Sequence, residues 1–202
     1  RLLRLLKHAG GEALLESLEF ADELTGLANR KRWQAQVAQG LADPLADECR
    51  AVVLFDLDHF KQINDRFGHQ AGDQVLREVA ALLQAEAAPG DKLARCGGEE
   101  FALLLARYDR ATVVADVQRM LQRLAEHPFF PPAAGSGAPV WAGGTSFERV
   151  THRFEDTAPA ALESDTTRRM PVTASAGLAV VQPRSTFADL MNQADVALYE
   201  AK

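Results

Sequence analysis

The run from Arg50 to Leu57 (RAVVLFDL) constrains the fold of this chain more than any other segment. It is nearly all apolar and contains two β-branched valines, and it lacks the alternation of polar and apolar residues that marks a strand with one solvated face. Continuous apolar runs of this kind are typical of strands buried on both faces. The run therefore predicts a central strand in a sheet that helices cover.

Helical and strand patterns follow one another around this strand in an order that defines the fold class. We expect helices over about 30–42, 60–67, 70–87, 110–127 and 186–201, and strands over 91–95, 101–106 and 172–182. Gly97-Gly98 lies between two of these strands and predicts a β-hairpin. The order contains a βαββαβ unit, which predicts an α+β fold, an α/β sandwich with a central, mostly antiparallel sheet flanked by helices.

The length of 202 residues favours one globular domain with room for an extension or an insertion. Residues 1–20 have the leucine pattern of an amphipathic connecting or signalling helix, so we place the domain itself at 21–202. Within it, the stretch at about 128–170 interrupts the regular order of elements. A connection of this length is unusual inside a compact domain, so we interpret it as an atypical insertion.

Charge and cysteine content exclude several classes of protein. The net charge is −6 and the basic residues are dispersed, so no basic stripe for nucleic acid is evident. Cys49 and Cys96 form no disulfide framework, which favours a reducing, cytoplasmic compartment. The chain has no apolar run long enough to span a bilayer. It starts at Arg1 without Met, so we expect a longer protein, whose remainder can still carry a membrane anchor.

Acidic side chains gather where the central strand ends. If the 51–57 strand pairs antiparallel with the 101–106 strand, its carboxyl end lies beside the turn at Gly97-Gly98. Asp56 and Asp58 would then face Glu99 and Glu100. Four carboxylates in one place repel one another and need a cation, and Mg²⁺ prefers such hard oxygen ligands. Asp58, taken alone, is as readily a solvated residue at the end of a strand.

Three polar residues downstream suit a nucleotide. Lys61 lies one turn into a helix whose free N–H groups can bind an anion, so its ammonium can reach a phosphate. Asn64 shares that helical face and can hydrogen-bond a base edge. Asp73, in the first turn of the next helix, can accept from guanine N1–H and its amino group, which adenine lacks. Each of the three is individually a common surface residue, and only the set favours nucleotide binding.

These residues belong to motifs that resemble one family. Gly97-Gly98-Glu99-Glu100-Phe101 resembles the signature pentapeptide of GGDEF-family diguanylate cyclases. The segments beginning at Asp22 (DELTGLANR), Phe55 (FDLDHFKQINDRFGHQAGD) and Ala194 (ADVALYEAK) are similar to its opening wrap, its nucleotide-binding segment and its closing helix. The matches extend from 22 to 202 apart from the insertion. The resemblance implies a sheet like those of palm and nucleotidyl cyclase domains.

The resemblance implies a role for each matching residue. Mg²⁺, for which Mn²⁺ can substitute, would be bound by Asp56, the backbone carbonyl of Leu57, Glu99 and Glu100. Lys61 and Lys202 would contact the triphosphate, and Asn64, His69 and Asp73 would recognise the guanosine. Glu99 would accept the proton of the 3′-hydroxyl, so that Glu99 and Lys61 carry the catalysis. The implied reaction condenses two GTP into cyclic di-GMP and two pyrophosphates in a homodimer that an upstream sensor domain controls.

One family feature is missing from the sequence. Many members carry an Arg-x-x-Asp product-inhibition site whose Asp lies six positions before the first glycine of the signature. Here Ala88 stands in place of the arginine and Asp91 is retained. A guanidinium makes bidentate contacts that alanine cannot replace, so we predict weak or absent feedback inhibition at this site.

Two other functions fit parts of the pattern. A catalytically inactive GGDEF module would bind GTP or cyclic di-GMP as a receptor, although such members typically lose some of the residues that are present here. A palm-like nucleotidyl transferase acting on nucleic acid shares the paired carboxylates, but the dispersed basic residues disfavour it.

Overall fold

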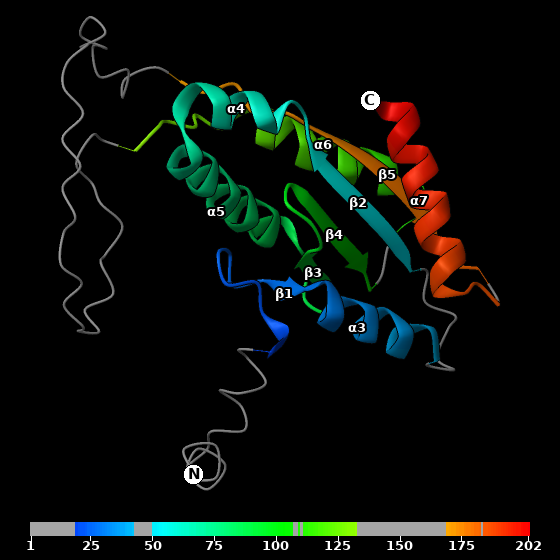
Figure 1. The fold of residues 1–202 in the computed structure, drawn as a ribbon. Coiled ribbons are helices and arrows are strands. Elements are labelled where there is room, and N and C mark those ends of the chain that lie inside the picture. Colours follow the sequence, from blue (N-terminus) through cyan, green and yellow to red (C-terminus); the bar gives the residue numbers. More distant parts are fainter. Residues whose placement is uncertain (1–18, 43–49, 107–108, 110, 133–168, 183) are drawn as a thin grey trace, which may run out of the picture.

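The computed structural model describes residues 19–42, 50–106, 109, 111–132, 169–182 and 184–202. Within these residues the chain forms an α+β fold, as the sequence predicts (Figure 1). The elements are β1 (Ala28–Asn29), α3 (Arg30–Ala42), β2 (Ala51–Leu57), α4 (Phe60–Phe67), α5 (His69–Glu86), β3 (Lys92–Arg95), β4 (Glu100–Leu105), α6 (Val113–Glu126), β5 (Ala174–Val180) and α7 (Phe187–Ala201).

The sheet has the strand order β1-β3-β4-β2-β5, with β2 between two antiparallel neighbours. The register pairs Ala51 with Leu105 on one side of β2 and with Val180 on the other. β3 and β4 form the expected hairpin across the Gly97-Gly98 turn. The two-residue strand β1 was not predicted, and it pairs parallel to β3. The prediction of a mostly antiparallel sheet is therefore confirmed.

Both faces of β2 are buried, as its composition predicts. Side chains of a strand point alternately to opposite faces, so the residues of β2 enter two different cores. Val53, Phe55 and Leu57 enter a core that residues of α5 and α6 complete. Val52 and Leu54 enter a second core with Trp33 of α3 and residues of α7. Figure 1 shows α5 on one side of the sheet and α3 and α7 on the other.

Close packing of α7 against the sheet depends on Gly177 in β5. A Cβ at this position would collide with the backbone carbonyl of Ala194 in α7. Leu190, Ala194 and Leu198 of the same helix are buried against this face. The helix also begins with a capping box in which Thr186 and Asp189 satisfy each other's backbone N–H groups. As a result, the end of α7 reaches the carboxyl end of β2.

Parts of three predictions lie outside the described residues. These are nearly all of the helix expected at 1–20, Cys49, and the centre of the insertion at 128–170. The two ends of the insertion are described, and they meet in an antiparallel bridge between Phe129 and Met170, both of which are buried. None of the described helices is both long enough and apolar enough to cross a membrane.

Candidate active site

Asp56 is the centre of the candidate site at the carboxyl end of β2. It is 9% exposed and is the one charged residue in the buried set of the described chain. The antiparallel register places it opposite Glu100 of β4. Lys202 Nζ donates to Asp56 Oδ1 at 2.7 Å, and this hydrogen bond raises the pKa of the lysine. The closing helix therefore brings a cation to the carboxylate of the central strand.

Glu99 lies beside this pair in the turn between β3 and β4. Its backbone carbonyl accepts from the Leu57 N–H at 3.3 Å, so the turn is anchored to the end of β2. Partial burial raises the pKa of the Glu99 carboxyl, and the charges of Asp56 and Glu100 raise it further. The charge of Lys202 opposes this shift. The charges of Asp56 and Glu100 thus act on Glu99 in the direction that repulsion among acids produces, whereas Asp58 does not contribute to the shift.

The donor set at this position fits a divalent cation of the Mg²⁺ type. The charge of Asp56 raises the pKa of the Glu99 carboxyl, and the Lys202 ammonium lies within hydrogen-bond distance of Asp56. Among the described residues, no group of three or more His, Cys, Asp or Glu side chains is arranged to hold a metal. Mg²⁺ commonly takes only one or two protein carboxylates and completes its octahedron with water and phosphate oxygens. Asp56, Glu99 and the Leu57 carbonyl suit that pattern.

Glu100 differs from its two neighbours in where its side chain points. Its carboxylate folds back over Gly97, so closely that a Cβ at that glycine would collide with it. Together with Arg30, Asn192 and Asp195, it also lines a cavity of about 280 Å³ between α3 and α7. Neither Asp56 nor Glu99 lines this cavity. In this arrangement, Glu100 contributes charge to the site while its carboxylate faces the α3–α7 side.

Asp58 does not face the glutamates as we expected. Its carboxylate accepts hydrogen bonds from Thr173 Oγ1 and Ser175 Oγ, each at 2.8 Å. Its backbone N–H donates to the Thr173 carbonyl at 2.9 Å. The expectation failed because β5 lies on the other side of β2 from β4, and the chain turns toward β5 where β2 ends.

The residues predicted to recognise guanosine lie on α4 and α5. Asn64 packs so closely on Gly72 that a Cβ there would collide with its side-chain oxygen, and Asp73 follows Gly72 directly. Asn64 and Asp73 are therefore neighbours on two packed helices. The helix α5 begins at His69, so Asp73 lies in its second turn, not in its first as predicted. A helix-dipole explanation for this acid is correspondingly weaker, because the effect fades beyond the first turn.

Lys61 and His69 are both exposed near the starts of these helices. Lys61 is the second residue of α4, where a lysine can extend toward a phosphate bound at the end of β2. His69 is the first residue of α5, and Gly68, with φ +85°, forms the turn between the two helices. Lys61 therefore lies close in sequence to the carboxyl end of β2, and His69 lies at the turn between the two helices.

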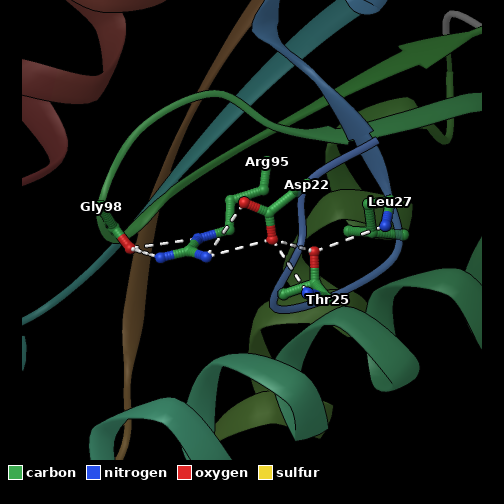
Figure 2. Close-up of polar contacts among 5 residues, drawn as sticks. All are labelled: Asp22, Thr25, Leu27, Arg95 and Gly98. Carbon is green, nitrogen blue, oxygen red and sulfur yellow. Dashed lines mark hydrogen bonds and ion pairs between the residues drawn. The ribbon is translucent and has the colours of Figure 1, made fainter. Parts of the chain in front are cut away.

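Arg95 is a residue of the site that sequence reasoning missed. Its Nε and Nη2 donate to the Gly98 carbonyl at 3.2 and 2.7 Å, and its Nη1 contacts both carboxylate oxygens of Asp22 (Figure 2). Asp22 also accepts from the backbone N–H and the hydroxyl of Thr25. Partial burial acts to raise the pKa of Asp22, but these hydrogen bonds and the charge of Arg95 lower it overall.

This network fixes the glycine turn that carries Glu99 to the segment that precedes β1. The side chains of Arg95 and Asp22 are only 13% and 22% exposed, so water screens their interaction less than it screens a surface pair. Arg95 lies two positions before Gly97, but Asp22 is 73 residues away along the chain. The sequence signal for this network was the arginine two positions before the glycine signature. Its partner Asp22 could not be identified from sequence spacing.

Ala88 and Asp91, at the position of the family's product-inhibition site, form a turn that their own hydrogen bonds close. Asp91 Oδ2 accepts from the Ala88 N–H at 2.8 Å and Asp91 Oδ1 accepts from the Ala106 N–H at 2.9 Å. The Asp91 N–H in turn donates to the Ala88 carbonyl. Both carboxylate oxygens therefore close the turn before β3 and hold it to the end of β4.

Comparisons with known proteins agree with this geometry. The family described as "Diguanylate cyclase, GGDEF domain" matches residues 19–136. A probable diguanylate cyclase of Escherichia coli, DgcE, is 33% identical over 94% of this chain. The bifunctional diguanylate cyclase/cyclic di-GMP phosphodiesterase MucR of Pseudomonas aeruginosa is 36% identical over 55% of it. The matches make up only 14% and 16% of those two proteins, respectively.

A similar solved structure gives the same fold. The coiled coil and GGDEF domain of DgcB from Caulobacter crescentus, in complex with c-di-GMP, superposes with a TM-score of 0.71. The sequences are 26% identical, and the match covers 98% of this chain and 86% of that one.

Proposed function

Because the chain belongs to the GGDEF-domain family of diguanylate cyclases, we propose that it condenses two GTP molecules into cyclic di-GMP and two pyrophosphates with Mg²⁺ as its cofactor. The observation that carries the proposal is the group at the end of β2, where Asp56, Glu99 and Lys202 interact next to the start of α4. An acidic edge of this kind, with lysines at its border, suits a metal-bound triphosphate.

Recognition of guanosine is proposed for the α4–α5 pair. Asp73 would accept from the N1–H and the amino group of guanine, and Asn64 would bind another position on the base edge. The close packing of Asn64 on Gly72 holds the two polar groups together. His69 at the start of α5 would contact the same nucleoside. The Asp73 carboxylate matches the adjacent N1–H and amino donors of guanine. Adenine lacks this pair of donors and would bind less well.

The reaction needs a base, a charge clamp and a second substrate. Glu99 would take the proton from the 3′-hydroxyl of one GTP, and its raised pKa suits a group that must accept a proton. The 3′-oxygen then bonds to the α-phosphorus of the other GTP as the bond to the β-phosphate oxygen breaks and pyrophosphate leaves. Lys61 and Lys202 would stabilise the triphosphate charge, and Mg²⁺ would supply further charge neutralisation.

A second copy of the chain completes the active unit. Each domain would bind one GTP, so the two 3′-hydroxyls can reach the opposing α-phosphates only when two domains face each other with twofold symmetry. We expect a homodimer, and we expect an upstream sensor domain of a longer protein to control it. Nucleic acid is not among the proposed partners.

The first test is the formation of cyclic di-GMP and pyrophosphate from GTP with Mg²⁺ over a range of protein concentrations. We expect the rate to rise faster than linearly with concentration and to fall by about 10²- to 10⁴-fold in Glu99→Gln, which loses the base. GTP binding without product, even at high concentration or with an artificial dimerising fusion, would instead support the receptor function. ATP turnover equal to GTP turnover would contradict the role of Asp73.

A further inference from the structure

The carboxylate of Asp58 joins the loop after β2 to the beginning of β5. Each of its oxygens accepts from a different hydroxyl at 2.8 Å, one from Thr173 and one from Ser175. The backbone N–H of Asp58 adds a third hydrogen bond, to the Thr173 carbonyl. Three hydrogen bonds thus hold one residue to β5 and to the residue just before it, more than 110 residues away in sequence.

The residue after Asp58 has an unusual backbone. His59 adopts φ 54° and ψ 27°, the left-handed conformation that residues with a side chain seldom take. Such a conformation persists where the surrounding structure holds it. The helix α4 begins directly after His59, at Phe60, and has no side-chain cap at its first turn. The start of α4 therefore lies between the hydrogen-bonded Asp58 and the buried Phe60, without a capping side chain.

The groups assigned to substrate and metal lie on both sides of this point. The Leu57 carbonyl belongs to the residue just before Asp58, and Lys61 lies two residues after His59. The Leu57 N–H is bonded to the Glu99 carbonyl on the β4 side. The loop is consequently held between the glycine turn on one side and the hydroxyls of β5 on the other.

We propose that Asp58 is a positioning residue whose bonds to Thr173 and Ser175 hold the left-handed turn at His59, and thereby set the Leu57 carbonyl and Lys61 for the metal-bound triphosphate. The proposal rests on the proposed function and refines it. It separates Asp58 from Asp56, whose carboxylate points to Lys202. Asp58 acts on the reaction through the backbone and does not ligate the metal.

The test removes the partners of Asp58 without touching the carboxylates. Thr173→Val/Ser175→Ala deletes both hydroxyl donors and keeps similar side-chain volumes. It is compared with Asp58→Ala, with the triple variant, and with Ser185→Ala. Ser185 is a matched control, since its hydroxyl oxygen accepts from the Gln182 N–H beyond the opposite end of β5. For each protein, kcat, KM for GTP, the half-saturating Mg²⁺ concentration and the thermal midpoint are measured.

We expect Thr173→Val/Ser175→Ala and Asp58→Ala to lower kcat by a similar factor of roughly 10 to 100, the range seen when a ligand loses its supporting shell. The half-saturating Mg²⁺ concentration should rise in both, and the triple variant should show no further loss because all three side chains act as one unit. Ser185→Ala should match the wild type. These values are compared below the thermal midpoint of every variant, so loss of folding does not enter.

His59→Gly gives the sharpest distinction from a metal-ligand role. Glycine adopts positive φ without strain, so His59→Gly should restore part of the lost kcat when added to Asp58→Ala. A missing metal ligand cannot be replaced in this way. The proposal is overturned if His59→Gly gives no rescue, or if Thr173→Val/Ser175→Ala keeps wild-type kcat and Mg²⁺ dependence while Asp58→Ala loses both.

A readout that needs no turnover keeps the two proposals apart. Amide hydrogen exchange should quicken at Leu57, Asp58 and Gln62 in Thr173→Val/Ser175→Ala but stay unchanged in α6. If the wild-type chain makes no cyclic di-GMP, the proposed function fails while the exchange result still decides whether Asp58 holds the turn. If the wild type is active and exchange at these amides does not change, only the positioning role fails.

Discussion

At one end of the β3–β4 hairpin the turn carries Glu99, with Glu100 beside it at the start of β4, whereas the segment at the other end carries Asp91. The two carboxylate oxygens of Asp91 accept hydrogen bonds from the backbone N–H groups of Ala88 and Ala106. Burial and neighbouring acids raise the pKa of Glu99, so its charged form is less favourable here than in water. Sequence alone shows acids in turns at both ends. Where their hydrogen bonds go separates an acid that stabilises the fold from one that is available for chemistry.

The largest effect that tests this comparison is on turnover. Asp56→Asn should reduce kcat by roughly 10²- to 10³-fold because a charged ligand at the reacting centre is lost. Its thermal midpoint should stay close to that of the wild type, since removing the Lys202 ion pair is offset by weaker repulsion of Glu99. Cyclic di-GMP formation and thermal unfolding, measured on the same samples, check both statements.

Asp91→Asn is the matched variant at the other end of the hairpin. The amide offers one acceptor oxygen for two backbone N–H groups, so we expect a loss of about 1 kcal/mol in the free energy of unfolding. Turnover should remain within about twofold of wild type once the assay is below the thermal midpoint, because a local stability loss leaves the chemistry intact. A large fall in kcat with an unchanged midpoint would break the comparison.

Arg95 gives an intermediate effect because it both stabilises the fold and holds the glycine turn. Arg95→Met removes the donor to the Gly98 carbonyl and leaves Asp22 with only its Thr25 donors, so we expect a loss of about 1–3 kcal/mol in the free energy of unfolding. We also expect kcat to fall by about tenfold, because Glu99 follows Gly98 directly and loses its position.

Arg119→Met is the control for Arg95. Arg119 pairs with Asp116 on α6, but its side chain is 57% exposed, and such surface pairs contribute less than about 1 kcal/mol. Denaturant unfolding and steady-state rates of the two variants separate the roles. Equal losses in both would mean that the link between Asp22 and Gly98 does no more than an ordinary surface pair.

These contacts also show which parts of the molecule the sequence could reveal. β2 and the hairpin were predictable because an apolar run and a Gly-Gly turn are local patterns. The proximity of Asp56 and Glu99 was predicted from the positions at which β2 ends and the hairpin turns. β1 could not be predicted, because two residues carry no periodicity. Its pairing with β3 depends on the tertiary fold.

The missed contacts share one physical cause. Arg95 meets Asp22 across 73 residues, and Asp58 meets Ser175 across 117 residues. Hydrogen bonds of this kind join elements that neighbour each other only after the sheet has formed, so no spacing rule contains them. For Asp58, the sequence placed the residue at the correct edge but assigned its carboxylate to the wrong neighbouring strand.

A smaller effect concerns the stability of the metal-free protein. The pKa of Glu99 is above its ordinary value of 4.5, so ionisation of this group disfavours the folded state at neutral pH. Glu99→Gln should therefore raise the thermal midpoint in EDTA at pH 7.5, by a few degrees at most for a partly exposed group. The gain should shrink as pH falls through the folded pKa toward 4.5.

Thermal scans at several pH values measure this gain, with Glu23→Gln as the control at an exposed glutamate. The control should show no such pH-dependent gain. Equal behaviour of Glu99→Gln and Glu23→Gln would mean that the acids at the end of β2 do not repel one another as their positions imply.

The smallest expected effect is on feedback inhibition, where we predict no change. Ala88 lacks a guanidinium, and both carboxylate oxygens of Asp91 already accept from backbone N–H groups, so the position lacks the bidentate donor that a guanine or a phosphate would need. Asp91→Ala should leave the inhibition of GTP turnover by cyclic di-GMP within about twofold of wild type, because only the fold loses a contact there. Titration calorimetry with cyclic di-GMP on both proteins is the direct measurement. Tight, stoichiometric binding that Asp91→Ala abolishes would show that Asp91 exchanges its backbone partners for the ligand. Asp91 would then bind a ligand as well as stabilise the fold, and the contrast with Glu99 would no longer hold.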